Sequence, residues 1–172
     1  MSLISNEAAL YNEVANPLDG IEEIMTHNDW SFSRPYDDQL SVQVNGKSTV
    51  YDLNFLWQPE YNAMQFSCQM DLSIPMPFME QICGALQKIN QKLWMGYFTA
   101  YEEDGFLAIK FRHTCLYRGL YESSGIEIAE DLIDVALAEC ERYYATFQMI
   151  SSSVKPYNDN LDLSLMDVAG CS

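Results

Sequence analysis

The sequence predicts an α+β domain with helices packed on one face of an antiparallel sheet, in the order α-β-β-β(-β)-α-β-β-α. Apolar residues recur at helical spacing in three segments. Between these segments, short stretches alternate apolar and polar residues, as half-buried strands do. The connections between neighbouring strands are too short for a crossover, which makes these strands antiparallel.

The first helix is expected to begin at Asn16-Pro17 and to end near His27-Asn28. Asparagine is a favourable N-cap, and proline at the first helical position sacrifices no hydrogen bond. The apolar stripe of this helix consists of Leu18, Ile21, Ile24 and Met25. A first strand is expected from Trp30, and Pro35 should end it.

A meander of strands follows. Residues 40–44 alternate as a half-buried strand, and Asn45-Gly46 favours a tight type I′ turn, in which both central residues have positive φ. Residues 49–57 form the return strand, and Pro59 opens the next turn. Residues 63–72 alternate again, with Met64, Phe66, Cys68 and Met70 on one side.

The second half of the chain is predicted to contain a helix, a hairpin and a further helix. A helix is expected over residues 78–93, ended by Gly96, with an apolar face of Phe78, Ile82, Cys83, Leu86, Ile89 and Leu93. A hairpin of residues 97–102 and 106–111 should turn at Asp104-Gly105. The last helix should begin at Ser124, which forms a capping box with Glu127. Its stripe contains Ala129, Leu132, Ile133, Ala136, Leu137, Cys140, Tyr144 and Phe147.

These elements define the expected domain organisation. Residues 1–15 form an N-terminal segment that could fray, and residues 16–150 form a single domain. Residues 151–172 form a tail that is either a short docking helix or disordered.

The charge balance excludes several classes of partner. The chain has 9 Lys plus Arg against 25 Asp plus Glu, a formal net charge of −16. So acidic a chain repels phosphate backbones and anionic lipid surfaces, and we therefore expect neither nucleic acid nor membrane as a partner. No apolar run is long enough for a membrane span, and the N-terminus does not resemble a secretory signal. A cytoplasmic location is the resulting expectation.

The cysteines fit that location. The chain has 5 of them, at Cys68, Cys83, Cys115, Cys140 and Cys171, without the paired spacing of a zinc site or a disulfide framework. They are expected to be buried free thiols in a reducing compartment.

No catalytic constellation is evident. His27 and His113 have no other ligand at metal-binding spacing, and the pairing of His113 with Cys115 as base and nucleophile depends on the fold. The acidic tail around Asp159 and Asp162 lacks the glycine and closing glutamate of a calcium loop. We therefore expect no catalytic residue, no metal and no cofactor. An enzyme using Cys115, His113 or a carboxylate pair remains an alternative.

Particular residues resemble the YbjN family of bacterial proteins, which are described as sensory transduction regulators. The resemblance covers about residues 16–150. It rests on Asn16-Pro17, Ile21-Glu22, Trp30-Ser31-Phe32-Ser33-Arg34, Tyr51-Asp52-Leu53, Trp57, Ile89-Asn90, Leu93-Trp94-Met95-Gly96-Tyr97-Phe98, Phe111-Arg112-His113 and Ala138-Glu139-Cys140-Glu141-Arg142. It implies a fold similar to type III secretion chaperones, which are often dimeric and hold extended segments of other proteins. It supplies no functional residue.

The resulting hypothesis is a non-enzymatic protein-binding module, chaperone-like or regulatory, that acts as a homodimer through apolar grooves. Tyrosine, tryptophan and methionine are frequent at such surfaces, and the chain is rich in all three. The candidate residues for the partner or dimer surface are Trp57, Trp94, Met95 and Phe98. The alternative is a small-molecule sensor whose pocket lies between the sheet and the helices.

Overall fold

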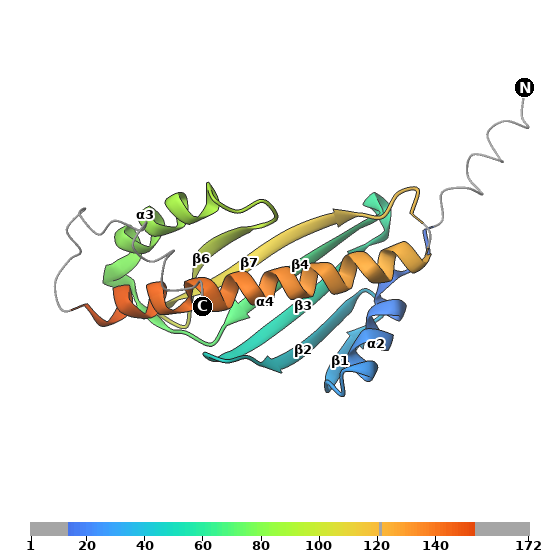
Figure 1. The fold of residues 1–172 in the computed structure, drawn as a ribbon, viewed down its shortest axis with the longest axis horizontal. Helices are drawn as coiled ribbons and strands as arrows, with labels where there is room; N and C mark the ends of the chain where they lie inside the picture. Colours follow the sequence, from blue (N-terminus) through green and yellow to red (C-terminus); the bar gives the residue numbers. More distant parts are fainter. Residues whose placement is uncertain (1–13, 121, 154–172) are drawn as a thin grey trace, which may run out of the picture.

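The computed structural model describes residues 14–120 and 122–153. Their order of elements confirms the predicted α+β class (Figure 1). In chain order they are α2 (Pro17–His27), β1 (Phe32–Tyr36), β2 (Gln39–Asn45), β3 (Val50–Gln58), the 3-10 helix Pro59–Tyr61, β4 (Ala63–Met70), β5 (Ile74–Pro75), the 3-10 helix Met76–Phe78, α3 (Met79–Asn90), β6 (Tyr97–Glu103), β7 (Phe106–Leu116) and α4 (Glu122–Ser152).

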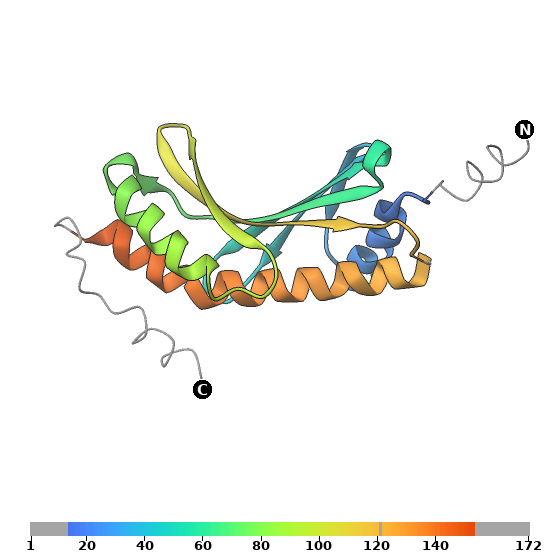
Figure 2. The ribbon, with the colours of Figure 1, turned by 90° about the horizontal axis from the view of Figure 1, so that it is seen from above.

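The strands of the described residues form one antiparallel sheet of seven strands. The sheet runs β1-β2-β3-β4-β7, β6 pairs with β7, and the short β5 pairs with the start of β7. The long helix α4 crosses the sheet, and α2 and α3 lie on the same side as α4 (Figure 2). The β6–β7 hairpin and the β3–β4 connection bend away from α4, so the opposite side of the sheet is concave (Figure 2).

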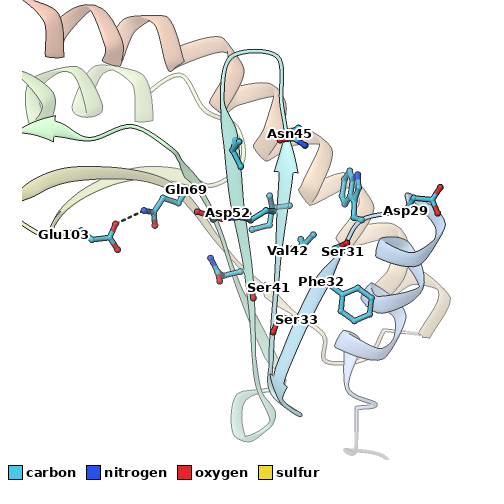
Figure 3. Close-up of a pocket in the computed structure, with 15 residues that line it drawn as sticks. Asp29, Ser31, Phe32, Ser33, Ser41, Val42, Asn45, Asp52, Gln69 and Glu103 are labelled. Atoms are coloured by element: carbon cyan, nitrogen blue, oxygen red, sulfur yellow. Dashed lines mark hydrogen bonds between the residues drawn. The ribbon is translucent and has the colours of Figure 1, made fainter.

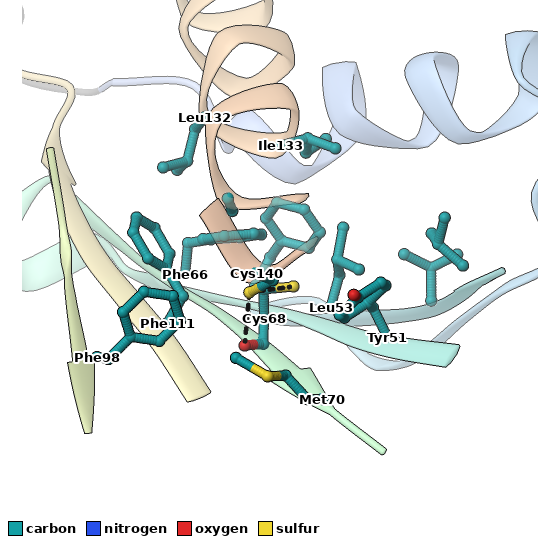
Figure 4. Packing of buried hydrophobic residues seen from close by; sticks show 14 of the residues in the cluster. Tyr51, Leu53, Phe66, Cys68, Met70, Phe98, Phe111, Leu132, Ile133 and Cys140 are labelled. Carbon is teal, nitrogen blue, oxygen red and sulfur yellow. Dashed lines mark hydrogen bonds between the residues drawn. The ribbon is translucent and has the colours of Figure 1, made fainter. Parts of the chain in front are cut away.

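The core fills the space between α4 and the sheet. The predicted faces of β4 and α4 meet there: Met64, Phe66 and Cys68 are fully or almost fully buried, as are Ala129 and Leu132. Cys140 on α4 places its Sγ 3.7 Å from the Sγ of Cys68 on β4 (Figure 4). Side-chain spacing at period 2 and period 3.6 therefore predicted the buried faces of both elements.

Two predictions of local structure are confirmed, one by a helix cap and one by the backbone angles of a turn. Asn16 caps α2 by accepting a hydrogen bond from the Leu18 N–H at 3.0 Å, and α2 ends at His27. The β6–β7 hairpin turns at Asp104 and Gly105, whose φ values of 51° and 81° match the type I′ requirement.

The connection between β2 and β3 differs from the predicted two-residue turn. Asn45 pairs with Val50, and the Gly46 N–H donates to the Thr49 carbonyl at 2.9 Å. Neither Asn45 nor Gly46 is among the residues with positive φ. The prediction of a type I′ turn at Asn45-Gly46 is therefore wrong, because the strands pair only as far as Asn45 and Val50.

A carboxylate from α4 holds this loop. Glu141 accepts hydrogen bonds from the Lys47 N–H at 2.6 Å, the Ser48 N–H at 3.1 Å and the Ser48 hydroxyl at 2.6 Å. Burial by itself would raise the pKa of Glu141, but these bonds outweigh it, and the pKa lies below its usual value. A Cβ at Gly46 would lie 2.4 Å from the Glu141 Oε1, so glycine permits the approach.

Four further sequence expectations need correction. Pro35 lies inside β1 rather than ending it, because β1 is an edge strand with an irregular register between Ser33 and Tyr36. Cys83 is exposed and not part of the buried face of α3. That helix ends at Asn90, well before Gly96. Ser124 lies inside α4, which begins at Glu122, so it is not the N-cap.

Three expectations fall outside the described residues. They concern the N-terminal segment up to residue 13, the tail from residue 154 with Asp159 and Asp162, and the thiol of Cys171.

Candidate functional site: the open face of the sheet

The four residues predicted for a partner surface lie in very different surroundings. Trp57 is 5% exposed and Phe98 is 2% exposed, and both belong to the hydrophobic core. They are therefore not surface residues, and this part of the prediction is wrong. Met95 is partly buried and packs against the core, whereas Trp94 is 75% exposed. An aromatic side chain alone does not distinguish a core residue from an interface residue, since protein cores and interfaces are both rich in aromatic rings.

Another surface stands out instead. The side of the sheet away from the three helices, which we call the open face, carries the alternate side chains of every long strand. On β2, β3 and β4 these are mostly Ser, Gln, Asn and Asp, and on β7 they include Lys110 and Arg112. The expected docking surface was apolar. The uncovered side of this sheet is mostly polar, because most apolar strand residues are buried against α4; Leu56 and Tyr97 are exceptions that lie on the open face.

The register aligns one line of these side chains across six strands. Ser33 pairs with Ser41, Ser41 with Asn54, Asn54 with Ser67, and Ser67 with Arg112. Arg112 pairs in turn with Tyr97 on β6. Residues opposite one another in register share a face of the sheet, so these six side chains form a continuous line, the polar row. The polar row consists of Ser33, Ser41, Asn54, Ser67, Arg112 and Tyr97.

Two hollows lie along the open face and share Ser41 and Asn54. The larger, of about 1050 Å³, is bordered by Asp29 on one side and by Glu103 on the other (Figure 3). The smaller, of about 380 Å³, is lined by Ser67 and Arg112 among others. The polar row therefore connects the two hollows across the middle of the sheet.

The open face carries charges of both signs. Lys110 and Arg112 lie two residues apart on β7 and line the smaller hollow. Asp29, Asp52 and Glu103 line the larger one. The open face thus carries cationic and anionic side chains close together, since Asp52 and Lys110 both pair with Gln69, which also binds Glu103.

In the line of residues beside the polar row, Gln69 and Lys110 have internal partners. Gln69 donates a hydrogen bond to Glu103 at 2.9 Å and accepts one from the Tyr101 hydroxyl. The Lys110 ammonium lies 4.0 Å from the centre of the Tyr101 ring. Burial lowers the pKa of Lys110, and Arg112 lowers it further, although Glu103 acts in the opposite direction.

The polar row has no such internal partners. Among the described residues, no hydrogen bond or ion pair is formed by the side chains of Ser33, Ser41, Asn54, Ser67 or Arg112. Arg34, by contrast, is bound to Asp19 at 2.7 Å and to Glu22 at 2.8 Å. The donors of the polar row are consequently available to a ligand.

The edge strand next to this face is already protected. The Asn90 side chain donates to the Phe98 carbonyl at 3.0 Å and accepts from the Phe98 N–H at 2.7 Å. It thereby occupies the backbone groups that β6 would offer to an added strand at that point. The β6 edge is therefore blocked at Phe98 against the addition of a further strand.

The residues of the enzyme alternative do not form a reactive pair. His113 and Cys115 are alternate residues of β7, on the side that faces α4, opposite Phe66 and Met64 of β4. Burial raises the pKa of Cys115 to about 11 and lowers the pKa of His113. A thiol with so high a pKa is a poor nucleophile. No group of His, Cys, Asp and Glu in the described ranges could hold a metal ion.

Sequence reasoning missed the polar row, although part of its signal is present. The alternation of Ser41, Asn54 and Ser67 with buried residues marks three exposed strand faces. Their alignment with Arg112 depends on the strand register and on the pairing of β4 with β7, which the sequence pattern does not give.

The described part of the chain has no helix long and apolar enough to cross a membrane. Its fold and site define an α+β domain with helices on one side of the sheet and a polar, concave face on the other. The family model described as "YbjN: Putative bacterial sensory transduction regulator" matches residues 17–149. The chain therefore belongs to the YbjN family.

A solved structure supplies a second similarity. The crystal structure of YbjN from E. coli, described as "a putative transcription regulator", matches with 13% identity and a TM-score of 0.49. The match covers 74% of this chain and 93% of the other. No curated protein matches this chain significantly.

Proposed function

We propose that this protein is a cytoplasmic, non-enzymatic regulator that binds another polypeptide on the open face of its sheet. The observation that supports this most directly is the polar row, which presents hydroxyl, amide and guanidinium donors without partners in a concave surface. An extended polypeptide offers a carbonyl oxygen at every residue and matches such a line of donors. The regulatory role accords with the description of the YbjN family.

The small-molecule alternative has less support. Its pocket was expected between the sheet and the helices, and core side chains such as Phe66, Phe111 and Phe147 fill that space. The hollows described above lie on the opposite side of the sheet and are wide and open. Such a surface suits a polypeptide better than a small ligand, which is usually enclosed.

Photo-crosslinking in the native cell tests the proposal. A photoreactive benzoylphenylalanine in place of Asn54, in the middle of the open face, is expected to crosslink to a distinct polypeptide identified by mass spectrometry. The matched control carries the same group in place of Asp134, an exposed residue of α4 on the other side of the sheet. If both positions capture the same set of proteins, or Asn54 captures none, the proposed function is wrong.

The homodimer is part of the same proposal, and Trp94 is its best-placed contact. Trp94 is 75% exposed and offers an apolar surface that a second copy would bury. We expect twice the monomer mass by sedimentation velocity, and Trp94→Ser is expected to weaken the dimer about tenfold or more.

Tyr36→Ser provides the control for that measurement. Tyr36 is 67% exposed at the end of β1, at the opposite edge of the sheet from β6. Its replacement should leave the dimer unchanged. A monomeric wild-type protein, or an equal effect of the two substitutions, would contradict a dimer through Trp94.

A further inference from the structure

The polar row is specific enough to indicate the chemistry of its ligand. We infer that it binds an extended peptide segment that places a carboxylate on Arg112, with the adjoining main chain over Ser67, Asn54 and Ser41. This inference rests on the proposed function and specifies which kind of segment the open face selects.

The first step concerns Arg112. Its guanidinium is exposed on the open face and forms no ion pair within the described residues, although the chain has an excess of 16 negative charges. Arg34 and Arg142, in contrast, each have a carboxylate within 4 Å. Arginine is suited to bidentate binding of a carboxylate, which its planar fork matches.

The second step concerns Lys110. It lies two residues from Arg112 on the same face; burial lowers the pKa of Lys110 most, and the like charge of Arg112 lowers it further. Lys110 is held against the Tyr101 ring and Arg112 is not, so Arg112 remains the available cation. An incoming carboxylate would relieve the repulsion between them.

The third step concerns length. Neighbouring strands lie about 4.8 Å apart, so the polar row from Ser33 to Tyr97 spans roughly 24 Å. An extended peptide advances about 3.3 Å per residue, so about seven residues would cross the row. The hydroxyl and amide groups of Ser41, Asn54 and Ser67 would then donate to peptide carbonyl oxygens.

The fourth step concerns the remaining charges of the segment. The larger hollow contains Asp29, Asp52 and Glu103, and the protein as a whole is acidic. These charges would repel a uniformly acidic segment. The best ligand therefore combines one carboxylate, on Arg112, with basic residues elsewhere.

A pair of synthetic peptides gives a sharp test. The first is Lys-Ser-Gly-Glu-Ser-Gly-Lys, acetylated, amidated and fluorescently labelled, and the second has Gln in place of Glu. General attraction to an acidic protein favours the Gln peptide, because it carries more positive charge. A specific contact with Arg112 predicts the reverse order, with the Glu peptide bound about tenfold more tightly in fluorescence anisotropy.

Matched variants locate the contact. Arg112→Gln is expected to remove the preference for the Glu peptide, whereas Arg118→Gln removes the same charge from the loop between β7 and α4 and should preserve it. Amide resonances of Ser41, Asn54 and Ser67 in the wild-type protein should shift on titration with the Glu peptide, a readout that needs no variant. Equal or tighter binding of the Gln peptide by the wild type would overturn the inference.

Two further outcomes distinguish a failure of this inference from a failure of the proposed function. If inorganic phosphate shifts the resonances of the polar row and neither peptide does, the site takes a small anion and the inference is wrong. If the Glu peptide fails while Asn54 still crosslinks to a polypeptide in cells, carboxylate recognition is wrong and the proposed function stands.

Discussion

Replacing Phe98 with alanine is expected to lower the free energy of unfolding by about 3–5 kcal/mol, the usual cost of removing a large buried aromatic side chain. Phe98 is 2% exposed, and its ring centre lies 5.6 Å from that of Phe111, 5.9 Å from Tyr143 and 5.7 Å from Phe147. It therefore joins β6 to β7 and to α4. Urea denaturation followed by circular dichroism measures the change.

Trp94→Ala is the control for this prediction, measured at a protein concentration low enough to dissociate the proposed dimer, so that the loss of a dimer contact does not affect the unfolding free energy. Trp94 lies four positions earlier and is 75% exposed, so its removal should change the free energy of unfolding by no more than about 0.5 kcal/mol. The sequence pattern treated both residues as candidates for one surface. Similar effects of the two substitutions would show that Phe98 is not the core residue described above.

Gly96→Ala is expected to destabilise the protein by about 2–5 kcal/mol, for two separate reasons. Gly96 has φ of 68°, a left-handed conformation that costs an L-residue about 1–2 kcal/mol. In addition, its new Cβ would lie 2.1 Å from Cζ of the buried Phe111 ring, and overpacking costs about 1–3 kcal/mol. Urea denaturation measures this change as well.

Gly105→Ala measures the backbone cost alone, so the difference between the two variants gives the steric part of the Gly96→Ala effect. Gly105 also has positive φ, 81°, but nothing lies within 4 Å of a Cβ built there. It should therefore cost only the backbone term of about 1–2 kcal/mol. If Gly105→Ala destabilises the protein as much as Gly96→Ala, the close approach to Phe111 does not contribute.

The substitutions at Phe98 and Gly96 both disturb the packing of Phe111, which supports the open face from the other side of β7. Phe111 lies next to Arg112 in the sequence, points to the opposite side of β7, and is packed by both Phe98 and Gly96. Because successive strand residues point to opposite faces, fixing Phe111 in the core also fixes the position from which Arg112 projects. The core and the proposed binding row are thus two sides of the same strand.

The core also contains a pair of buried thiols. Cys68 and Cys140 are fully buried, and the hydrogen bond between them, together with burial, raises the pKa of Cys140. A thiol with a raised pKa, such as that of Cys140, is a poor nucleophile. The two thiols contribute to packing between β4 and α4, as expected from the sequence for buried cysteines.

The fold class was accessible from the sequence because periodicity is a local property. The alternation through Met64, Phe66 and Cys68 and the helical stripe from Ala129 to Phe147 each identify an element and its buried side. The turn at Asp104-Gly105 and the cap at Asn16 were also correct, since each depends only on adjacent residues. The resemblance to the YbjN family is confirmed by the match over residues 17–149.

The tertiary structure alone decided everything that joins distant segments. Glu141 binds the loop after Asn45 from a position 94 residues away from Lys47, and the predicted turn is not formed there. Burial assigned Trp57 and Phe98 to the core and left Trp94 outside. The polar row exists only because strand register aligns Ser41, Asn54 and Ser67 with Arg112. Register and burial arise from packing between elements, which no local pattern of residues contains.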